Sequence, residues 1–62
     1  MILTSREAAD YTRLSETQIE RLRQRGDGPP YIKIGRAVRY RDGDIAIWLE
    51  RHLKNAHVLE DI

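Results

Sequence analysis

Side chains that can bind nucleic acid are concentrated in two neighbouring stretches of this 62-residue sequence. Residues 29–41, PPYIKIGRAVRYR, carry four basic side chains and no acidic one, although the net charge of the chain is only +1. Residues 15–26, SETQIERLRQRG, add hydroxyl, amide and guanidinium groups. Basic groups bind phosphate, and Gln and Arg form paired hydrogen bonds with base edges. The two stretches therefore point to nucleic-acid recognition.

The charge is divided between the middle of the sequence and its ends. Residues 13–41 hold eight basic and three acidic side chains, a net charge of +5, and the remaining residues sum to −4. Such a distribution lets one face of a protein meet a polyanion while another faces water or a partner.

The composition predicts one small folded domain. Apolar residues make up 40% of the chain and charged residues 34%, which suits a compact fold. The chain has no Cys, so neither a disulfide nor a thiolate-bound zinc can supplement its core. No apolar run is long enough to cross a bilayer, and MILTSREAAD has neither the basic start nor the apolar stretch of a signal peptide. We therefore expect a cytoplasmic protein.

Two capping-box motifs mark the starts of two short helices. In each motif a hydroxyl residue is followed three positions later by Glu or Gln, so that each side chain satisfies the free backbone amide of the other residue. The two pairs are Thr4 with Glu7 and Ser15 with Gln18. They predict helices over about residues 5–11 and 16–25, joined by a tight turn, which is the pattern of a helix-turn-helix.

The second predicted helix carries the expected base contacts. Recognition helices insert their N-terminal half into the major groove, which places Thr17, Gln18 and Arg21 at base edges. Ser15 and Arg25 are expected on phosphate. An ordinary solvated helix would show the same polar face, so this prediction depends on the basic stretch that follows.

Residues 31–40 alternate in a way that predicts a β-hairpin with Gly35 and Arg36 as its two-residue turn. We expect an inward apolar face and an outward basic face. The expected inward residues are Ile32, Ile34, Val38 and Tyr40, and the outward ones are Lys33, Arg39 and Arg41. Basic edge strands also protect sheets from aggregation. Four basic residues without an acid nevertheless favour contact of Lys33, Arg36, Arg39 and Arg41 with the DNA backbone or the minor groove.

A third helix, capped by Asp42 and ending near Asn55, completes an α+β domain over residues 1–55. Residues 56–62 form a tail without a decisive pattern, which is flexible or contacts a partner. The predicted core consists of Ala8, Leu14, Ile19, Leu22, Ile34, Val38, Tyr40, Ile45, Trp48 and Leu49.

No catalytic or metal site is expected. His52 and His57 stand at no helical metal-binding spacing, and Asp42 and Asp44 have the positions of residues at a helix start. The sequence has no nucleophile with a base, no phosphate loop and no dinucleotide fingerprint. We therefore expect neither an enzyme nor a cofactor.

Four segments, LTSREAADY, LSETQIERLRQRG, PPYIKIGRAVRYR and DIAIWLE, together resemble the small winged helix-turn-helix proteins related to the MerR DNA-binding domain. These are the AlpA-like regulators and the excisionases of prophages and integrative elements. The resemblance implies binding to double-stranded DNA, as a transcriptional regulator or a recombination directionality factor. By matching position, the recognition-helix contacts are Ser15, Thr17, Gln18 and Arg21, and the wing contacts are Lys33, Arg36 and Arg39.

The sequence departs from this family in two places. YTRLS replaces the usual apolar residue and Gly of the turn, and Glu20 stands where an aromatic or basic residue is common. MerR regulators also carry a coiled coil and an effector domain, which this sequence lacks, so no small-molecule effector is expected. The chain would bind as single units or assemble with other copies on DNA, and residues 56–62 would contact a neighbouring copy or an integrase.

Three alternatives stay open from the sequence. The chain could regulate transcription without any part in recombination. It could be a small terminase subunit that marks viral DNA for packaging. It could also be a protein-interaction module that uses the hairpin and the second helix as a docking surface.

Overall fold

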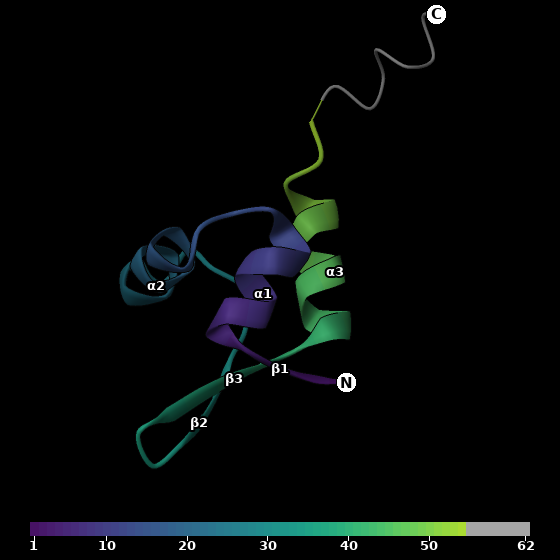
Figure 1. Ribbon diagram of the computed structural model, residues 1–62. Coiled ribbons are helices and arrows are strands. Elements are labelled where there is room, and N and C mark those ends of the chain that lie inside the picture. The colour runs from purple at the N-terminus through teal and green to yellow at the C-terminus, as the bar shows by residue number, and fades with distance from the viewer. Residues whose placement is uncertain (55–62) are drawn as a thin grey trace, which may run out of the picture.

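Three helices and a three-stranded antiparallel sheet form the domain in the computed structural model, which describes residues 1–54 (Figure 1). The elements are β1 (Ile2–Thr4), α1 (Ser5–Thr12), α2 (Glu16–Arg25), β2 (Ile32–Ile34), β3 (Ala37–Arg41) and α3 (Asp42–Arg51). The strand order in the sheet is β1-β3-β2. We call residues 32–41, which include β2, β3 and their turn, the wing. The predicted α+β winged helix-turn-helix fold is confirmed.

Both predicted capping boxes are present. Thr4 Oγ1 accepts from the backbone N–H of Glu7 at 3.1 Å, and the Thr4 N–H donates to Glu7 Oε1 at 2.9 Å. Ser15 and Gln18 form the same pair of bonds at 3.1 and 2.8 Å. Each box satisfies amides that the first turn of a helix leaves free. These local motifs explain why α1 and α2 start where the sequence predicts.

The turn between α1 and α2 contains a left-handed residue. Arg13 caps the end of α1 with φ of 62°, and it is the one residue other than glycine with positive φ among residues 1–54. Its N–H donates to Asp10 O at 3.3 Å, and the Leu14 N–H donates to Ala9 O at 3.0 Å. This conformation usually belongs to glycine, because a Cβ atom is crowded there.

The hairpin turn is confirmed at Gly35 and Arg36, with Gly35 at φ of 60° as a Gly-first turn requires. The predicted faces are correct for β3, where Val38 and Tyr40 lie toward the helices, but they are wrong for β2. Because the two-residue turn pairs Ile34 with Ala37, Lys33 lies opposite Val38 on the face toward the helices. The opposite face carries Ile32, Ile34, Arg39 and Arg41. The prediction continued the alternation of inward and outward residues through the two-residue turn, and this assigned the residues of β2 to the wrong faces.

The sequence had predicted Ile34 to be a core residue, and this prediction is wrong. Its side chain is 67% exposed near the end of the wing, on the sheet face away from the helices.

Strand β1 is an element that sequence reasoning missed. Leu3 pairs with Tyr40 and is buried, so it belongs to the sheet rather than merely preceding the first helix. Three residues carry too short a pattern to signal a strand, and their conformation depends on the pairing with β3. This pairing fixes the start of α1 on the sheet.

The core lies where α1, α2, α3 and the sheet meet. Its buried residues are Leu3, Ala8, Ala9, Ile19, Tyr40 and Ile45, and Leu14, Val38 and Leu49 pack against them. Most of the predicted core is confirmed. Leu22 and Trp48 are half-buried and lie outside this cluster, so their assignment to the core is wrong. Leu22 packs instead beside Gly28, whose backbone approaches it closely.

The two ends of α3 also differ from prediction. The N-cap residue is Arg41, and Asp42 is the first helical residue, whose Oδ1 accepts from Gly43 N–H at 2.9 Å and from the Met1 ammonium at 3.0 Å. These bonds lower the pKa of Asp42 from 3.8. At the other end α3 stops at Arg51, because the next amides bond three residues back and tighten the last turn.

The helix end predicted near Asn55 is therefore wrong, since α3 ends at Arg51. The predicted domain boundary at residue 55 and the predicted partner contact of residues 56–62 lie outside the described residues. In the part of the chain that the structure describes, no helix is long and apolar enough to span a membrane.

Candidate nucleic-acid interface

Helix α2 presents an exposed polar face beside the wing. Thr17, Gln18 and Arg21 are all exposed, as predicted, while Ile19 on the other face of the helix is completely buried. The helix is anchored by Ile19 and capped at both ends, by Ser15 and by Gly26 with φ of 77°. The side chains predicted to contact bases are therefore carried on a rigid element that projects from the body of the domain (Figure 1).

Gln18 is both a capping residue of α2 and a predicted base contact. Its Oε1 already accepts from the Ser15 N–H at 2.8 Å in the capping box. Paired recognition of adenine needs both the amide oxygen and the amide nitrogen. Gln18 can therefore donate from its amide nitrogen while the cap is intact, whereas paired contact would require opening the cap.

Among the described residues, the Ser15 hydroxyl is engaged only as an acceptor, from the Gln18 N–H at 3.1 Å. Its hydroxyl hydrogen is free to point outward, which suits the predicted phosphate contact. Arg25, the other residue predicted on phosphate, forms an ion pair of 3.5 Å with Asp27. Both side chains are 65% exposed, so this pair is weak and leaves guanidinium donors accessible.

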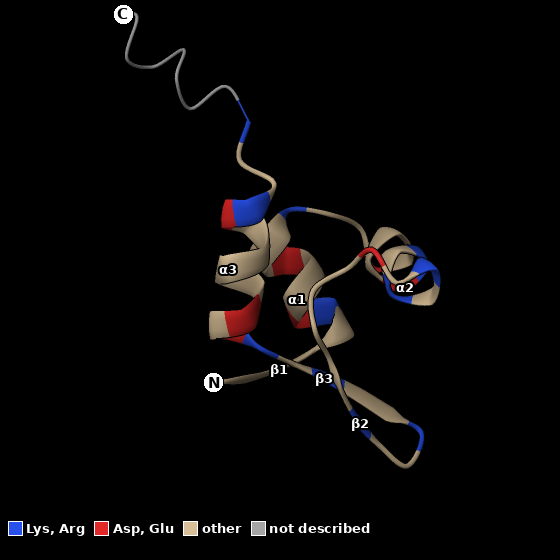
Figure 2. Cartoon of the chain, turned by 180° about the vertical axis from the view of Figure 1, so that it is seen from behind, with Lys and Arg blue, Asp and Glu red and all other residues tan. Residues whose placement is uncertain are grey.

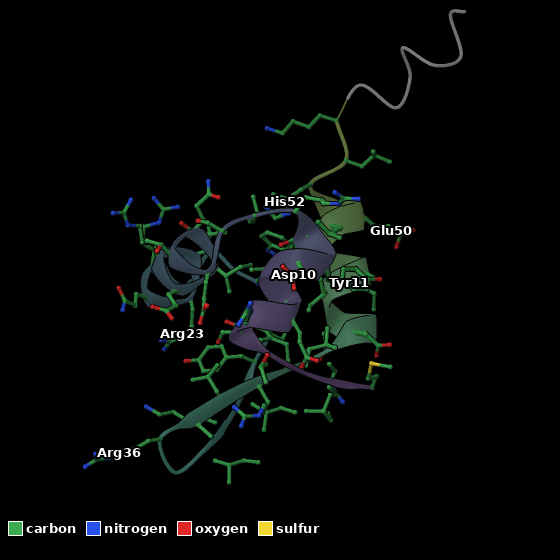
Figure 3. All side chains as sticks on the ribbon, viewed as in Figure 1. Asp10, Tyr11, Arg23, Arg36, Glu50 and His52 are labelled. Atoms are coloured by element: carbon green, nitrogen blue, oxygen red, sulfur yellow. The ribbon has the colours of Figure 1, made fainter. Side chains whose placement is uncertain are left out.

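The structure separates the four basic residues of the wing. Lys33 and Arg36 are exposed at its outer end, and Arg36 follows Gly35 at the tip (Figure 3). Arg39 is half-buried and donates from Nη1 to the Val38 carbonyl at 2.8 Å. Arg41 lies at the base of β3, roughly 13 Å along the strand from Ala37.

The side chain of Arg41 forms an ion pair with Asp44. Its Nε donates to Asp44 Oδ2 of α3 at 2.6 Å. Arg41 therefore joins β3 to α3 and does not gather with the wing-tip residues.

Arg23 is a residue of this region that sequence reasoning missed. Its guanidinium carbon lies 5.7 Å from the centre of the Tyr31 ring, and its Nε is buried without a hydrogen-bond partner in the described chain. Figure 3 shows Arg23 on the side of α2 that faces the wing. The available signal was its spacing, because Arg23 stands four residues after the buried Ile19 and so lies on the inward side of the helix.

The charges are unevenly distributed over the domain (Figure 2). Lys and Arg lie along α2 and the wing, while much of the acidic colour lies on α1 and α3. Among the described residues, no group of three His, Cys, Asp or Glu could hold a metal ion.

A family model for the helix-turn-helix domain matches residues 2–53, from the start of β1 to beyond the end of α3. The chain belongs to the helix-turn-helix domain family. No curated protein matches it significantly. In this helix-turn-helix protein α1 and α2 are the two helices of the motif, and the left-handed Arg13 lies in the turn.

Membership of the helix-turn-helix family supports a small DNA-binding protein that acts as a regulator, with DNA as its partner. Domains of this family are typically non-enzymatic.

Proposed function

We propose that this helix-turn-helix protein binds a specific DNA sequence, with the N-terminal half of α2 in the major groove and the wing on the adjacent backbone or minor groove. One observation carries the proposal: α2 and the wing project on the same side of the domain, and both bear exposed basic residues (Figures 1 and 2). A helix fits the major groove, and a basic hairpin beside it can contact phosphate.

The proposed base contacts are Thr17, the amide nitrogen of Gln18 and the guanidinium of Arg21. Arg21 lies one turn beyond Gln18 and is exposed, so it is free to donate two hydrogen bonds to guanine. The proposed phosphate contacts are Ser15, Arg25, Lys33, Arg36 and Arg39. Arg41 is the weakest member of the predicted set because Asp44 already binds it.

For the biological role, we propose an excisionase, that is a recombination directionality factor, or a transcriptional regulator of the AlpA-like, MerR-related kind. The four segments that resemble those proteins support this choice, and they extend over the region that the family model matches. Other copies of the chain and an integrase are the proposed protein partners. A cytoplasmic location follows from this role.

A gel-shift titration tests the proposal. The full chain is titrated against the DNA upstream of its own gene and against any adjacent attachment site, with competitor DNA and at two salt concentrations. Discrete, competitor-resistant complexes are expected on one of these fragments. A ladder of complexes on an attachment site would support excision, and a single complex upstream of the gene would support transcriptional regulation.

The contrary result is equally informative. Binding that disappears under competitor on every fragment would refute sequence-specific recognition. It would favour a protein-interaction module, for which the exposed Ile34 near the wing tip offers an apolar contact.

A further inference from the structure

A hollow of about 350 Å³ lies between α2, the start of α1 and the wing. Its wall includes four arginines from separate elements of the fold. They are Arg6 of α1, Arg23 of α2, and Arg36 and Arg39 of the wing. Two of them, Arg6 and Arg23, belong to none of the contacts assigned above.

The hollow has a positive net charge. Glu16 and Glu20 also line it, so the lining residues carry four positive and two negative charges. Within residues 1–54, neither carboxylate forms an ion pair with any of the four arginines. The guanidinium groups are therefore not neutralised by partners within the described fold, and they can bind an anion.

Arg23, which lines this hollow, has a donor that the described residues do not satisfy. Its Nε is buried and has no hydrogen-bond partner among residues 1–54. Unpaired buried donors are rare in folded proteins and call for a bound water or ion. Tyr31, under the guanidinium at 5.7 Å, holds Arg23 in place at this position.

The geometry of duplex DNA identifies the anion. A helix in the major groove and a hairpin on the neighbouring minor groove must lie on either side of the sugar-phosphate strand that separates the grooves. In that arrangement the hollow between α2 and the wing would face that strand. We propose that Arg6 and Arg23, together with Arg39, bind a backbone phosphate of this strand. This inference rests on the proposed binding of DNA by α2 and the wing.

The test compares single arginine variants of the full chain on a short labelled duplex of arbitrary sequence, since phosphate contacts do not depend on sequence. Fluorescence anisotropy gives the binding constant at a series of salt concentrations. Arg6→Ala is the main variant, because Arg6 is exposed and its loss should not disturb the core. Arg51→Ala is the matched control: it removes the same charge from an exposed position on α3, outside the hollow.

Arg6→Ala should weaken binding several-fold and lower the slope of log K against log salt by about 0.9, the value for one phosphate contact. Arg51→Ala should leave the slope unchanged. Arg23→Lys, which keeps the charge but loses the planar fork, should retain most of the slope and still bind several-fold more weakly. Circular dichroism checks that each variant is folded.

Glu20→Gln gives an independent measure on the same duplex. Removing a carboxylate beside the phosphate should strengthen binding several-fold, because like charges repel. Unchanged or weaker binding would contradict a phosphate in the hollow.

Two failures can be told apart. If the unmodified chain binds the duplex and Arg6→Ala behaves like Arg51→Ala, the hollow is not a phosphate site, although the proposed function stands. If the unmodified chain binds neither the arbitrary duplex nor any fragment of the gel-shift titration, both proposals fail.

Discussion

Trp48 of α3 donates a hydrogen bond of 3.1 Å from its indole Nε1 to the backbone carbonyl of Asp27, in the loop that leaves α2. The indole is half-buried and also contacts the ring of His52 in a tilted arrangement, with ring centres 4.4 Å apart. This bond joins α3 to the segment that leads into the wing. Trp48 thus links α3 to the loop after α2 through a hydrogen bond, and it is not a residue of the buried core.

Trp48→Phe should lower the free energy of unfolding by about 1 kcal/mol, because it keeps the aromatic ring but removes the hydrogen bond. Trp48→Ala should lower it by about 2 to 3 kcal/mol, since it also removes the half-buried ring. Urea unfolding followed by circular dichroism measures both values. Glu50→Ala, at an exposed position of the same helix, should stay within about 0.5 kcal/mol of the unmodified chain. Equal stability of Trp48→Phe and the unmodified chain would show that the bond to Asp27 is not stabilising.

Arg13 offers a stabilising change. Its φ of 62° suits glycine better than any residue with a Cβ atom. Arg13→Gly should raise the free energy of unfolding by roughly 0.5 to 1 kcal/mol, the strain relieved being partly offset by the greater freedom of glycine in the unfolded chain. Arg13→Ala is the control, because it removes the same side chain but keeps the strain. If both variants change stability equally, the backbone conformation is not the cause.

Gln18 allows the cap of α2 to be separated from DNA recognition. Glutamate can accept the Ser15 N–H as Gln18 Oε1 does, so Gln18→Glu should leave the stability within about 0.5 kcal/mol. It removes the amide donor and adds a negative charge at the proposed interface, and it should weaken specific DNA binding by about 1 to 3 kcal/mol. Thermal unfolding and gel shift give the two quantities.

Gln24→Glu is the matched control for this change. It introduces the same charge at an exposed position further along α2, beyond the half of the helix proposed to enter the groove. An equal loss of binding in the two variants would mean that Gln18 contributes only through net charge.

The substitutions Arg21→Ala and Arg36→Ala should affect DNA binding in different ways. Arg21→Ala should cost about 1 to 3 kcal/mol on the preferred sequence and relax the choice of base, because Arg21 is the proposed guanine contact. Arg36→Ala at the wing tip should instead weaken binding to every sequence alike and lower the salt slope by about one unit. Competition between specific and arbitrary duplexes at several salt concentrations separates the two effects. If Arg21→Ala keeps the full preference for the specific sequence, Arg21 does not contact a base.

The parts of the fold that depend on neighbouring residues were predictable from sequence. The capping boxes at Thr4 and Ser15 and the left-handed Gly26 give α2 the predicted bounds and α1 nearly so. Each of these signals acts over only a few residues. The exposure of Thr17 and Arg21 follows from the same helical periodicity, whereas their contact with bases stays a prediction.

The parts that depend on distant pairing were not predictable. Leu3 becomes part of a strand only because Tyr40 lies opposite it, and the face that Lys33 occupies is set by its pairing with Val38. The hollow next to the wing likewise exists because the fold brings Arg6 and Arg23 together from two helices. A local pattern contains no information about such tertiary neighbours.

The stability of the domain should fall at alkaline pH because of Tyr40. This side chain is fully buried, and burial raises the pKa of its hydroxyl above 10.0, outweighing the opposing influence of Arg23 and Ser5. The folded domain therefore holds the phenol proton more tightly than the unfolded chain does. The contribution of the protonated Tyr40 hydroxyl to the free energy of unfolding is fully present below pH 10. It is lost as the pH rises through the higher pKa of the folded state.

Tyr40→Phe should reduce this alkaline loss, because phenylalanine does not ionise. At neutral pH the change should alter the free energy of unfolding by less than about 1 kcal/mol, since the buried hydroxyl forms no well-aligned hydrogen bond among residues 1–54 and its interaction with the nearby Ser5 is weak. Urea unfolding at neutral pH and at several alkaline pH values measures both effects. Tyr11→Phe removes the same hydroxyl from a side chain that is 47% exposed, and it should keep the alkaline loss of the unmodified chain. If Tyr40→Phe loses stability with pH as steeply as Tyr11→Phe, the ionisation of Tyr40 is not what unfolds the domain.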